Sequence, residues 1–244
     1  MKIIIAGPAG AGKGSLAWFL AKDYNVPHIS TGEIFRAAIK SGTELGKIAE
    51  KLIHKGELVP DDITTNLVLH RLKEADCKRG YILDGFPRTL VQAQLLDNAG
   101  EKIDFVINII VSKETVLARL GGRFVCKKCG LIHNKLWDKV DKCKDCGGEL
   151  FQREDDREEI ILKRLAEHNR EFKQVLDFYH DSEMKTKKPK TLELESKIDN
   201  SADDIYGIFM KKFSDIMDKA YIAEHMAHHD CTHCGGCCGK KKAK

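Results

Sequence analysis

Short apolar runs rich in β-branched residues alternate along the chain with longer amphipathic stretches. The apolar runs predict β-strands at 2–6, 26–30, 81–83, 105–111 and 191–194. The amphipathic stretches predict helices at 13–23, 89–98, 113–120, 155–184 and 202–217, and several more within 31–75, broken at Gly42 and at 56–60. Strands that alternate with helices predict an α/β fold in three layers, a parallel sheet with helices on both faces.

Two segments depart from this alternation. Residues 122–153 are rich in glycine, cysteine and lysine and have little periodicity, and residues 214–244 end in a cluster of possible metal ligands followed by lysines. No apolar run approaches the length needed to span a bilayer, and the first strand leads into a glycine loop instead of a signal peptide. We therefore expect a cytoplasmic protein without a membrane partner.

Charge and cysteine content carry information mainly through their position. Of the 244 residues, 42% are hydrophobic and 32% charged, as in ordinary globular proteins of one or two domains. The formal net charge of +4 equals the contribution of four tail residues, Lys240, Lys241, Lys242 and Lys244, so the body gives no argument for nucleic-acid binding. Eight of the nine cysteines fall into clusters, and the isolated Cys77 is expected in the core.

A phosphate-binding loop is predicted between the first strand and the first helix. The sequence Gly-Pro-Ala-Gly-Ala-Gly-Lys-Gly-Ser occupies residues 7–15. Glycines allow backbone N–H groups to surround phosphate oxygens, the helix N-terminus adds partial positive charge, and Lys13 is placed to reach the β- and γ-phosphates. The alternative, a merely flexible glycine turn, does not explain why strand, lysine and helix come in this order.

Four segments resemble adenylate kinases, within the wider class of nucleoside monophosphate kinases. They are Gly-Lys-Gly-Ser at 12–15, Ser-Thr-Gly-Glu-Ile-Phe-Arg at 30–36, Gly-Glu-Leu-Val-Pro-Asp at 56–61, and Asp-Gly-Phe-Pro-Arg-Thr at 84–89 with Gln92 behind it. The resemblance covers residues 1 to about 213. It implies a P-loop NTPase core over 1–29, 60–121 and 154–220, a helical AMP-binding insert over 30–59, a lid over 122–153 and an appended tail over 221–244.

The resemblance also implies a reaction, MgATP plus AMP giving two ADP reversibly, which maintains adenine nucleotide balance. ATP is expected to contact Gly10, Ala11, Gly12, Lys13, Gly14, Ser15, Arg119, Arg123, Ile132, His133 and Ala202. AMP is expected to contact Thr31, Arg36, Glu57, Leu58, Val59, Gly85, Phe86, Pro87, Arg88, Gln92, Arg153 and Arg164. Catalysis is assigned to Lys13, Asp84, Arg88, Arg123, Arg153 and Arg164, with Asp84 ordering Mg²⁺ through water near Ser15.

Simpler interpretations stand beside these assignments. Each arginine could lie on a solvated helix face, and Asp84 could cap its strand, although their spacing within the motifs favours the functional interpretation. Phe124 stands where the family often has a second arginine, so one charge contact is missing or was never essential. Thr31, the segment 58–59 and Gln92 favour AMP over UMP, CMP or GMP.

The lid segment carries a metal-binding pattern. Cys126 and Cys129 form one CxxC pair, Cys143 and Cys146 a second, and a glycine follows each pair. This spacing suits a structural zinc ion held by four thiolates, and zinc-bearing lids occur in the family. Two disulfides or a rubredoxin-type iron centre are the alternatives.

The tail adds a second cluster of possible ligands. His225, His228, His229, Cys231, His233, Cys234, Cys237 and Cys238 suit Zn²⁺, Cu⁺, Ni²⁺ or Co²⁺, with an iron–sulfur cluster as a weaker fit and a tail with incidental thiols as the simplest alternative. A metal-handling or zinc-ribbon nucleic-acid-binding protein is therefore the rival from another class. We expect a monomer that binds ATP, AMP and ADP and no nucleic acid.

Overall fold

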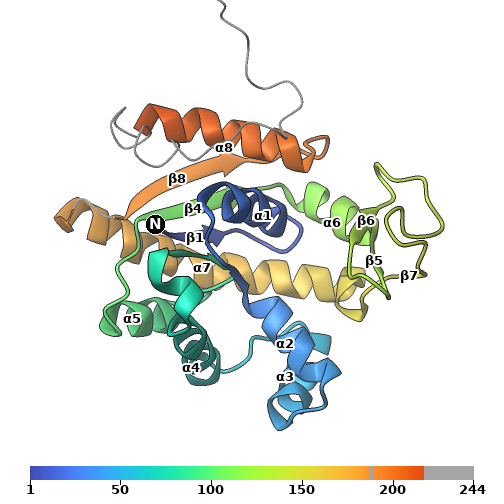
Figure 1. Cartoon of the computed structure of the whole chain (residues 1–244), viewed down its shortest axis with the longest axis horizontal. Helices are drawn as coiled ribbons and strands as arrows, with labels where there is room; N and C mark the ends of the chain where they lie inside the picture. The colour runs from blue at the N-terminus through green and yellow to red at the C-terminus, as the bar shows by residue number, and fades with distance from the viewer. Residues whose placement is uncertain (187–188, 217–244) are drawn as a thin grey trace, which may run out of the picture.

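A five-stranded parallel sheet forms the centre of the protein. The computed structural model describes residues 1–186 and 189–216 (Figure 1). The strands lie in the order β2-β3-β1-β4-β8 and span β1 (Lys2–Ala6), β2 (His28–Ser30), β3 (Tyr81–Asp84), β4 (Phe105–Ile110) and β8 (Lys190–Glu195). The predicted parallel α/β sheet is confirmed.

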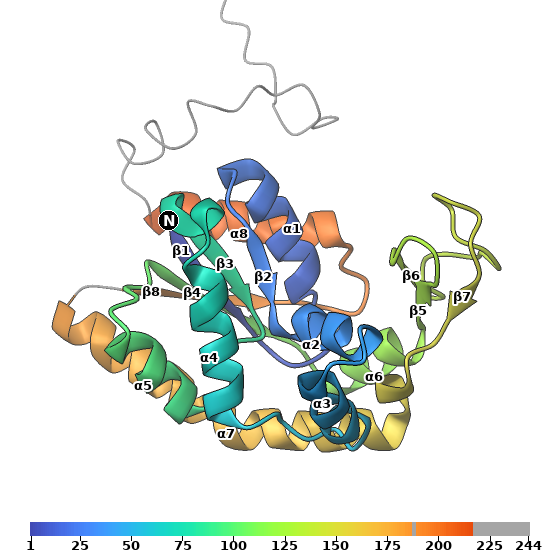
Figure 2. The same cartoon turned by 60° about the horizontal axis from the view of Figure 1, so that its bottom comes forward.

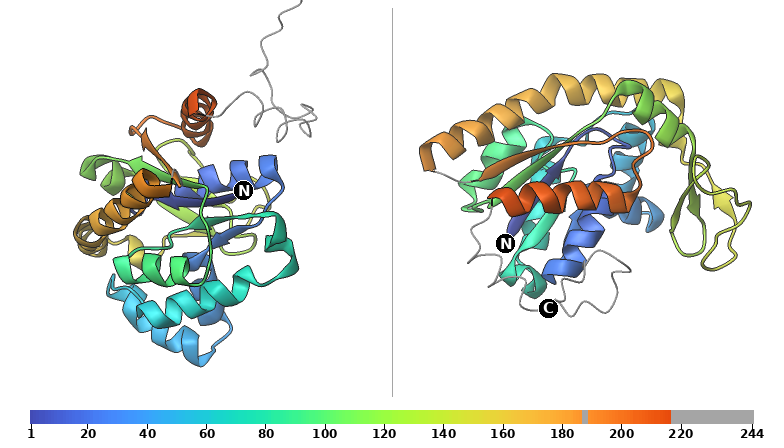
Figure 3. Two further views of the ribbon diagram at one scale, coloured as in Figure 1. Left: turned by 90° about the vertical axis from the view of Figure 1, so that its left-hand side faces the viewer. Right: turned by 90° about the horizontal axis from the view of Figure 1, so that it is seen from above.

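Helices cover both faces of this sheet, which gives three layers (Figure 3). One face packs against α1 (Lys13–Tyr24) and α8 (Ala202–Ile216), and the other against α4 (Asp61–Leu72), α5 (Leu90–Asn98) and α7 (Glu158–Thr186). Successive side chains of a strand point to opposite faces, so Ile3 and Ile5 enter the first core and Ile4 enters the second. Burial on both faces explains why the central strands β1, β3 and β4 are almost continuously apolar.

A helical hairpin follows β2. It consists of α2 (Thr31–Lys40) and α3 (Glu44–His54), whose apolar sides meet in a small core around Phe35, Ala49 and Val59. Gly46 allows the close crossing, because a Cβ there would come within 2.2 Å of the Ala38 carbonyl oxygen. The expected break at Gly42 is confirmed.

The segment that the sequence left without periodicity folds as a second, antiparallel sheet. Its strands are β5 (Arg123–Cys126), β6 (Ile132–Asn134) and β7 (Leu150–Phe151), in the order β6-β5-β7, and it follows α6 (Lys113–Gly121). A 3₁₀ turn, Glu154–Asp156, then leads into α7 and contacts α3. Figure 2 shows this sheet at the right-hand edge of the molecule and the hairpin at the lower right of the core.

Other expectations concern single residues and the chain end. Cys77 lies in a 3₁₀ turn, Ala75–Arg79, and is 4% exposed, so its predicted place in the core is confirmed. The ligand cluster and lysines of the tail lie outside the described residues. Within residues 1–186 and 189–216, none of the helices combines the length and apolar character required to cross a bilayer.

Candidate active site

The glycine loop between β1 and α1 wraps tightly at the carboxyl edge of the sheet. Gly7, Gly10 and Gly12 all have positive φ angles. A Cβ on Gly7 would come within 2.6 Å of the Ile109 carbonyl oxygen, so the loop tolerates no side chain there. Gly12, in a left-handed conformation, starts α1 and directs the helix N-terminus into the loop. This is the arrangement expected of a phosphate cradle.

Lys13 turns its ammonium group back over the loop. Its Nζ donates to the carbonyl oxygens of Gly7, at 2.9 Å, and Pro8, at 2.8 Å. Burial lowers the pKa of Lys13 to about 8, and the attraction of Asp84 only partly offsets burial and the repulsion of Arg88 and other arginines. A phosphate group next to this ammonium would stabilise its charge, so the loop is suited to an anionic ligand.

Asp84, the last residue of β3, lies beside the start of α1 and is 9% exposed. His28 of β2 hydrogen-bonds to it, with 3.2 Å between His28 Nε2 and Asp84 Oδ2. Burial raises the pKa of Asp84, but this hydrogen bond and the charge of Lys13 outweigh burial and hold the pKa below its usual range. The carboxylate is therefore ionised at neutral pH. His28 was not predicted from the sequence.

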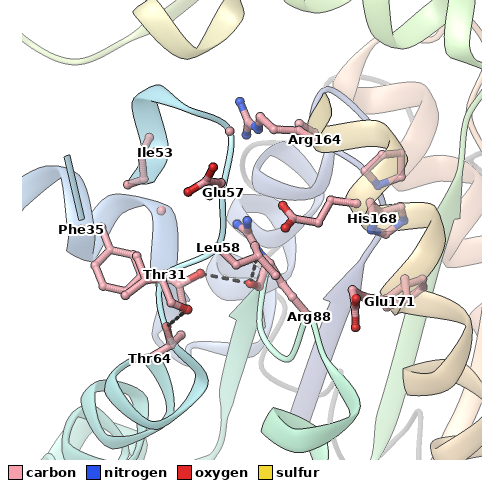
Figure 4. Close-up of a pocket in the computed structure, with 18 of the residues that line it drawn as sticks. Thr31, Phe35, Ile53, Glu57, Leu58, Thr64, Arg88, Arg164, His168 and Glu171 are labelled. Atoms are coloured by element: carbon pink, nitrogen blue, oxygen red, sulfur yellow. Dashed lines mark hydrogen bonds between the residues drawn. The ribbon is translucent and has the colours of Figure 1, made fainter. Parts of the chain in front are cut away.

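A pocket opens next to the loop, between the helical hairpin and α7. Figure 4 shows Thr31, Phe35 and Leu58 on one side, and Arg164 and His168 of α7 on the other. The predicted AMP residues that line this pocket are Thr31, Arg36, Glu57, Leu58, Val59, Gly85, Pro87, Arg88, Gln92 and Arg164. Phe86 does not line it, because its side chain is 1% exposed and packs in the core beneath.

The turn after β3 positions Arg88 at the floor of the pocket. The Gly85 carbonyl oxygen accepts hydrogen bonds from Arg88 Nε, at 2.8 Å, and from the Thr31 hydroxyl, at 3.1 Å. Gly85 has a φ of 73°, a conformation that glycine adopts without strain. Both remaining guanidinium nitrogens of Arg88 are thus left to meet a ligand.

Several of the predicted arginines are partly buried near one another, without enough opposite charge nearby to offset the cost of burial. Burial, with repulsion from Arg164, lowers the pKa of Arg88 to about 10. Burial, with repulsion from Arg36 and Arg123, lowers the pKa of Arg153 to about 10, and burial also lowers the pKa of Arg36. These guanidinium groups stay charged at neutral pH, so the site concentrates positive charge and favours a polyanion.

Two acidic residues that were not predicted from the sequence hold two of the site's arginines in place. Asp156 forms a two-point ion pair with Arg123, and Asp155 accepts from Arg164 NH1 at 2.8 Å. Both carboxylates are buried. Their position soon after Arg153 indicated a place near the site. Their arginine partners, however, lie 9 and 33 residues away in the sequence, so the ion pairs could not be predicted.

The structure brings only some of the residues predicted to contact ATP close to the phosphate loop. Arg119 lies against the loop and residues 196–200, with its NH1 2.9 Å from Ser196 Oγ, and its guanidinium carbon is 5.9 Å from the centre of the Trp137 ring. Trp137, which was not predicted, thus joins this region. Ile132 is 53% exposed, whereas His133 is 4% exposed, with Nε2 3.4 Å from Cys143 Sγ. The His133 ring is therefore buried inside the lid segment.

A lysine lies over the ring of Phe124. Lys135 Nζ lies 4.4 Å from the centre of the Phe124 ring, close enough for a cation–π interaction. A positive charge therefore lies beside this ring, where the family often has a second arginine.

The four lid cysteines converge on one point. Their sulfur atoms lie within 4.8 Å of one another and are free thiols, so the two-disulfide alternative does not describe this structure. Gly148 permits the approach, because a Cβ there would lie 2.8 Å from Cys126 Sγ. The Cys129 N–H points at Cys126 Sγ and lowers the pKa of the Cys126 thiol to about 6. Such a donor set fits a tetrahedral thiolate-bound metal ion such as zinc.

Fold and site together define a P-loop phosphotransferase with a pocket beside its phosphate loop. A family model described as adenylate kinase matches residues 5–184. Adenylate kinases of Bacillus cytotoxicus, at 48% identity, and of Bacillus thuringiensis, at 47%, are similar over 74% of this chain and 87% of their own length. The chain belongs to the adenylate kinase family, and the phosphoryl transfer from ATP to AMP that the sequence predicted is its reaction.

Proposed function

We propose that the terminal phosphoryl group of MgATP passes reversibly to AMP, giving two ADP, with each nucleotide bound by residues described above. ATP lies on the loop, against residues 10–15, Arg119 and Arg123, with its base packed near Ile132, His133 and the backbone around Ala202. AMP lies in the pocket between α2 and α7, with its phosphate towards Arg36 and Arg88. The position of Lys13 and Arg88 between loop and pocket supports this assignment.

The chain's own residues position the reactants and balance charge. The AMP phosphate oxygen attacks in line, so no side chain acts as a nucleophile. Backbone N–H groups of the loop bind the phosphates, and Lys13 contacts the β- and γ-phosphates. Arg123, Arg153 and Arg164 neutralise the charge on the transferring group. Ion pairs with Asp156 and Asp155 hold Arg123 and Arg164 in place before substrate binds.

Magnesium fits at the end of β3. Asp84 supplies an ionised, buried carboxylate beside the start of α1, which would order the ion through water, and the Ser15 hydroxyl lies in the first turn of the same helix. When bound with ATP, Mg²⁺ withdraws charge from the phosphate oxygens. Asp84 and Ser15 would order this ion.

Domain roles follow from these sites. We assign 30–59 to an AMP-binding insert, 122–153 to a lid, the core to 1–29, 60–121 and 154–220, and the tail to 221–244. Zinc on the four cysteines would fasten the lid, which is too small for a core of its own; iron of the rubredoxin type is the remaining rival. Closure of the basic lid excludes water, so the phosphoryl group goes to AMP. We propose a cytoplasmic monomer that binds no nucleic acid.

One observation carries the proposal: Lys13, Arg36, Arg88 and Arg164 line one pocket next to the loop, where burial and repulsion between these cations lower the pKa values of Lys13 and Arg88. The test is a coupled assay of ADP formation from ATP with AMP, CMP, UMP or GMP as acceptor. We expect AMP to give the highest kcat/KM by at least tenfold. Preference for another nucleotide would assign the chain to a different acceptor. An inactive protein that binds nucleic acid tightly would favour the rival metal-handling or nucleic-acid-binding function.

A further inference from the structure

The side-chain amide of Gln92 is held at both ends. Gln92 lies in the first turn of α5 and is 1% exposed. Its Oε1 accepts from the backbone N–H of Arg88 at 2.8 Å, and its Nε2 donates to Asp61 Oδ1 at 2.8 Å. Turning the amide over would bring an amino group to an N–H donor and a carbonyl oxygen to a carboxylate. Both exchanges are repulsive, so the orientation is fixed.

A fixed amide can read only one pattern of base atoms. A primary amide has two N–H donors and two acceptor lone pairs, and one of each is used by Asp61 and Arg88. Gln92 lines the pocket with one donor and one acceptor remaining. The Watson–Crick edge of adenine, with an amino donor at position 6 and an acceptor at N1, complements this pair. A 6-oxo purine, with an acceptor at position 6 and N1–H as donor, requires the amide to be turned over.

We propose that Asp61 is a specificity-determining positioning residue, which holds Gln92 in the orientation that admits a 6-amino purine monophosphate and rejects a 6-oxo purine monophosphate. The inference rests on the proposed binding of AMP in this pocket. Asp61 begins α4 directly after the pocket-lining segment 56–59, and its side chain is partly buried. Of the two amide partners, Asp61 is the one whose side chain can be replaced, because Arg88 acts through its backbone N–H.

The competing role for Asp61 is local. A carboxylate in the first turn of a helix is stabilised by the helix dipole. Asp62 shares that turn but is exposed, so Asp62→Asn removes the same charge from the same turn. It is the matched control for any effect on α4 alone.

The experiment compares AMP with inosine monophosphate, whose base is a 6-oxo purine, in wild type, Asp61→Asn, Asp61→Glu and Asp62→Asn. An asparagine at 61 offers both a donor and an acceptor, so it removes one of the two repulsions that fix Gln92 and leaves only the Arg88 backbone N–H to oppose the turned-over amide. We expect Asp61→Asn to lower the ratio of kcat/KM values, AMP over inosine monophosphate, at least tenfold, with kcat/KM for inosine monophosphate rising. Asp61→Glu and Asp62→Asn should retain the wild-type ratio to within a factor of about three.

Each other outcome overturns the inference. A parallel fall in kcat/KM for both acceptors in Asp61→Asn would show a structural role, and an equal change in Asp62→Asn would show a helix effect. If Asp61→Asn does not fold, Asp61→Glu decides, since loss of its discrimination would contradict the role of the carboxylate. A wild-type enzyme that does not prefer AMP would instead refute the proposed function itself.

Discussion

Arg123 at the start of β5 and Asp156, the last residue of the 3₁₀ turn before α7, form a buried two-point ion pair that joins the start of the lid segment to the turn that follows it. Arg123 Nε lies 2.8 Å from Asp156 Oδ2, and NH2 lies 2.5 Å from Oδ1. The side chain of Asp156 has no exposed surface, and that of Arg123 is 16% exposed. The pair therefore holds the Arg123 guanidinium in place before any nucleotide binds.

Arg123→Ala should therefore depress turnover. Removal of one group that neutralises developing charge lowers kcat by about 10²- to 10³-fold. The measurement is kcat for ADP formation at saturating ATP and AMP. Near-normal turnover would remove Arg123 from the mechanism.

Asp156→Asn should cost stability as well as activity, because it leaves Arg123 partly buried without its counter-charge. Breaking a buried pair costs about 3 kcal/mol of unfolding free energy. Arg157→Ala is the control: it breaks an exposed pair with Glu154 and should cost less than about 1 kcal/mol. Urea unfolding measures both variants, and equal losses would contradict the special role of the Asp156 pair.

Metal removal should loosen the lid. We expect about one zinc ion per chain in protein truncated after residue 220, none in the same truncated protein with Cys143→Ser, and one with Cys77→Ser, since Cys77 lies in the core. Elemental analysis measures this directly. The Cys143→Ser variant should also melt several degrees lower. Iron in the truncated wild-type chain would favour the rubredoxin-type alternative.

The tail should be dispensable for catalysis. The residues placed in the reaction all lie before position 217, within the part of the chain that the structure describes. Truncation after residue 220 should keep kcat and both KM values within about twofold. A tenfold loss would give the tail a catalytic part, and loss of a second metal equivalent on truncation would identify the tail as its site.

His168 makes the ligand-free enzyme sensitive to acid. Burial, with repulsion from Lys13 and Arg88, lowers the pKa of His168 to about 3. An unfolded histidine takes up a proton below about pH 6.5, whereas the folded one stays neutral, so stability falls as pH drops from 6.5 towards 3. At pH 5 this costs about 2 kcal/mol.

The neutral variant His168→Gln removes this penalty. Its unfolding free energy relative to wild type should therefore rise on going from pH 8 to pH 5, as urea unfolding at the two pH values would measure. An identical pH dependence in both proteins would show that His168 takes up a proton equally in the folded and unfolded states, and would contradict the lowered pKa.

Sequence patterns predicted the sheet because its central strands β1, β3 and β4 are buried on both faces and so form apolar runs, whereas β8 alternates buried and exposed residues towards its end. They did not predict β5, β6 and β7, which are two to four residues long and pair across the cysteine segment. His133 illustrates the consequence. On β6 neighbouring side chains face opposite ways, so Ile132 points outward and His133 points towards Cys143. A sequence motif gives the position of a residue along the chain. It does not show which way the side chain points when the strand that carries it was not predicted.

Counter-ions were missed for a related reason. Asp155, Asp156 and His28 act through side chains that only the fold brings near. The glycine loop, by contrast, is a local structure whose residues are consecutive, and its geometry follows directly from its sequence.

Direct transfer between two nucleotides can be tested by incubating the enzyme with MgADP alone. We expect ATP and AMP to appear in equal amounts, without inorganic phosphate, until the reaction reaches equilibrium. Release of phosphate, or ATP formed without an equal amount of AMP, would contradict it.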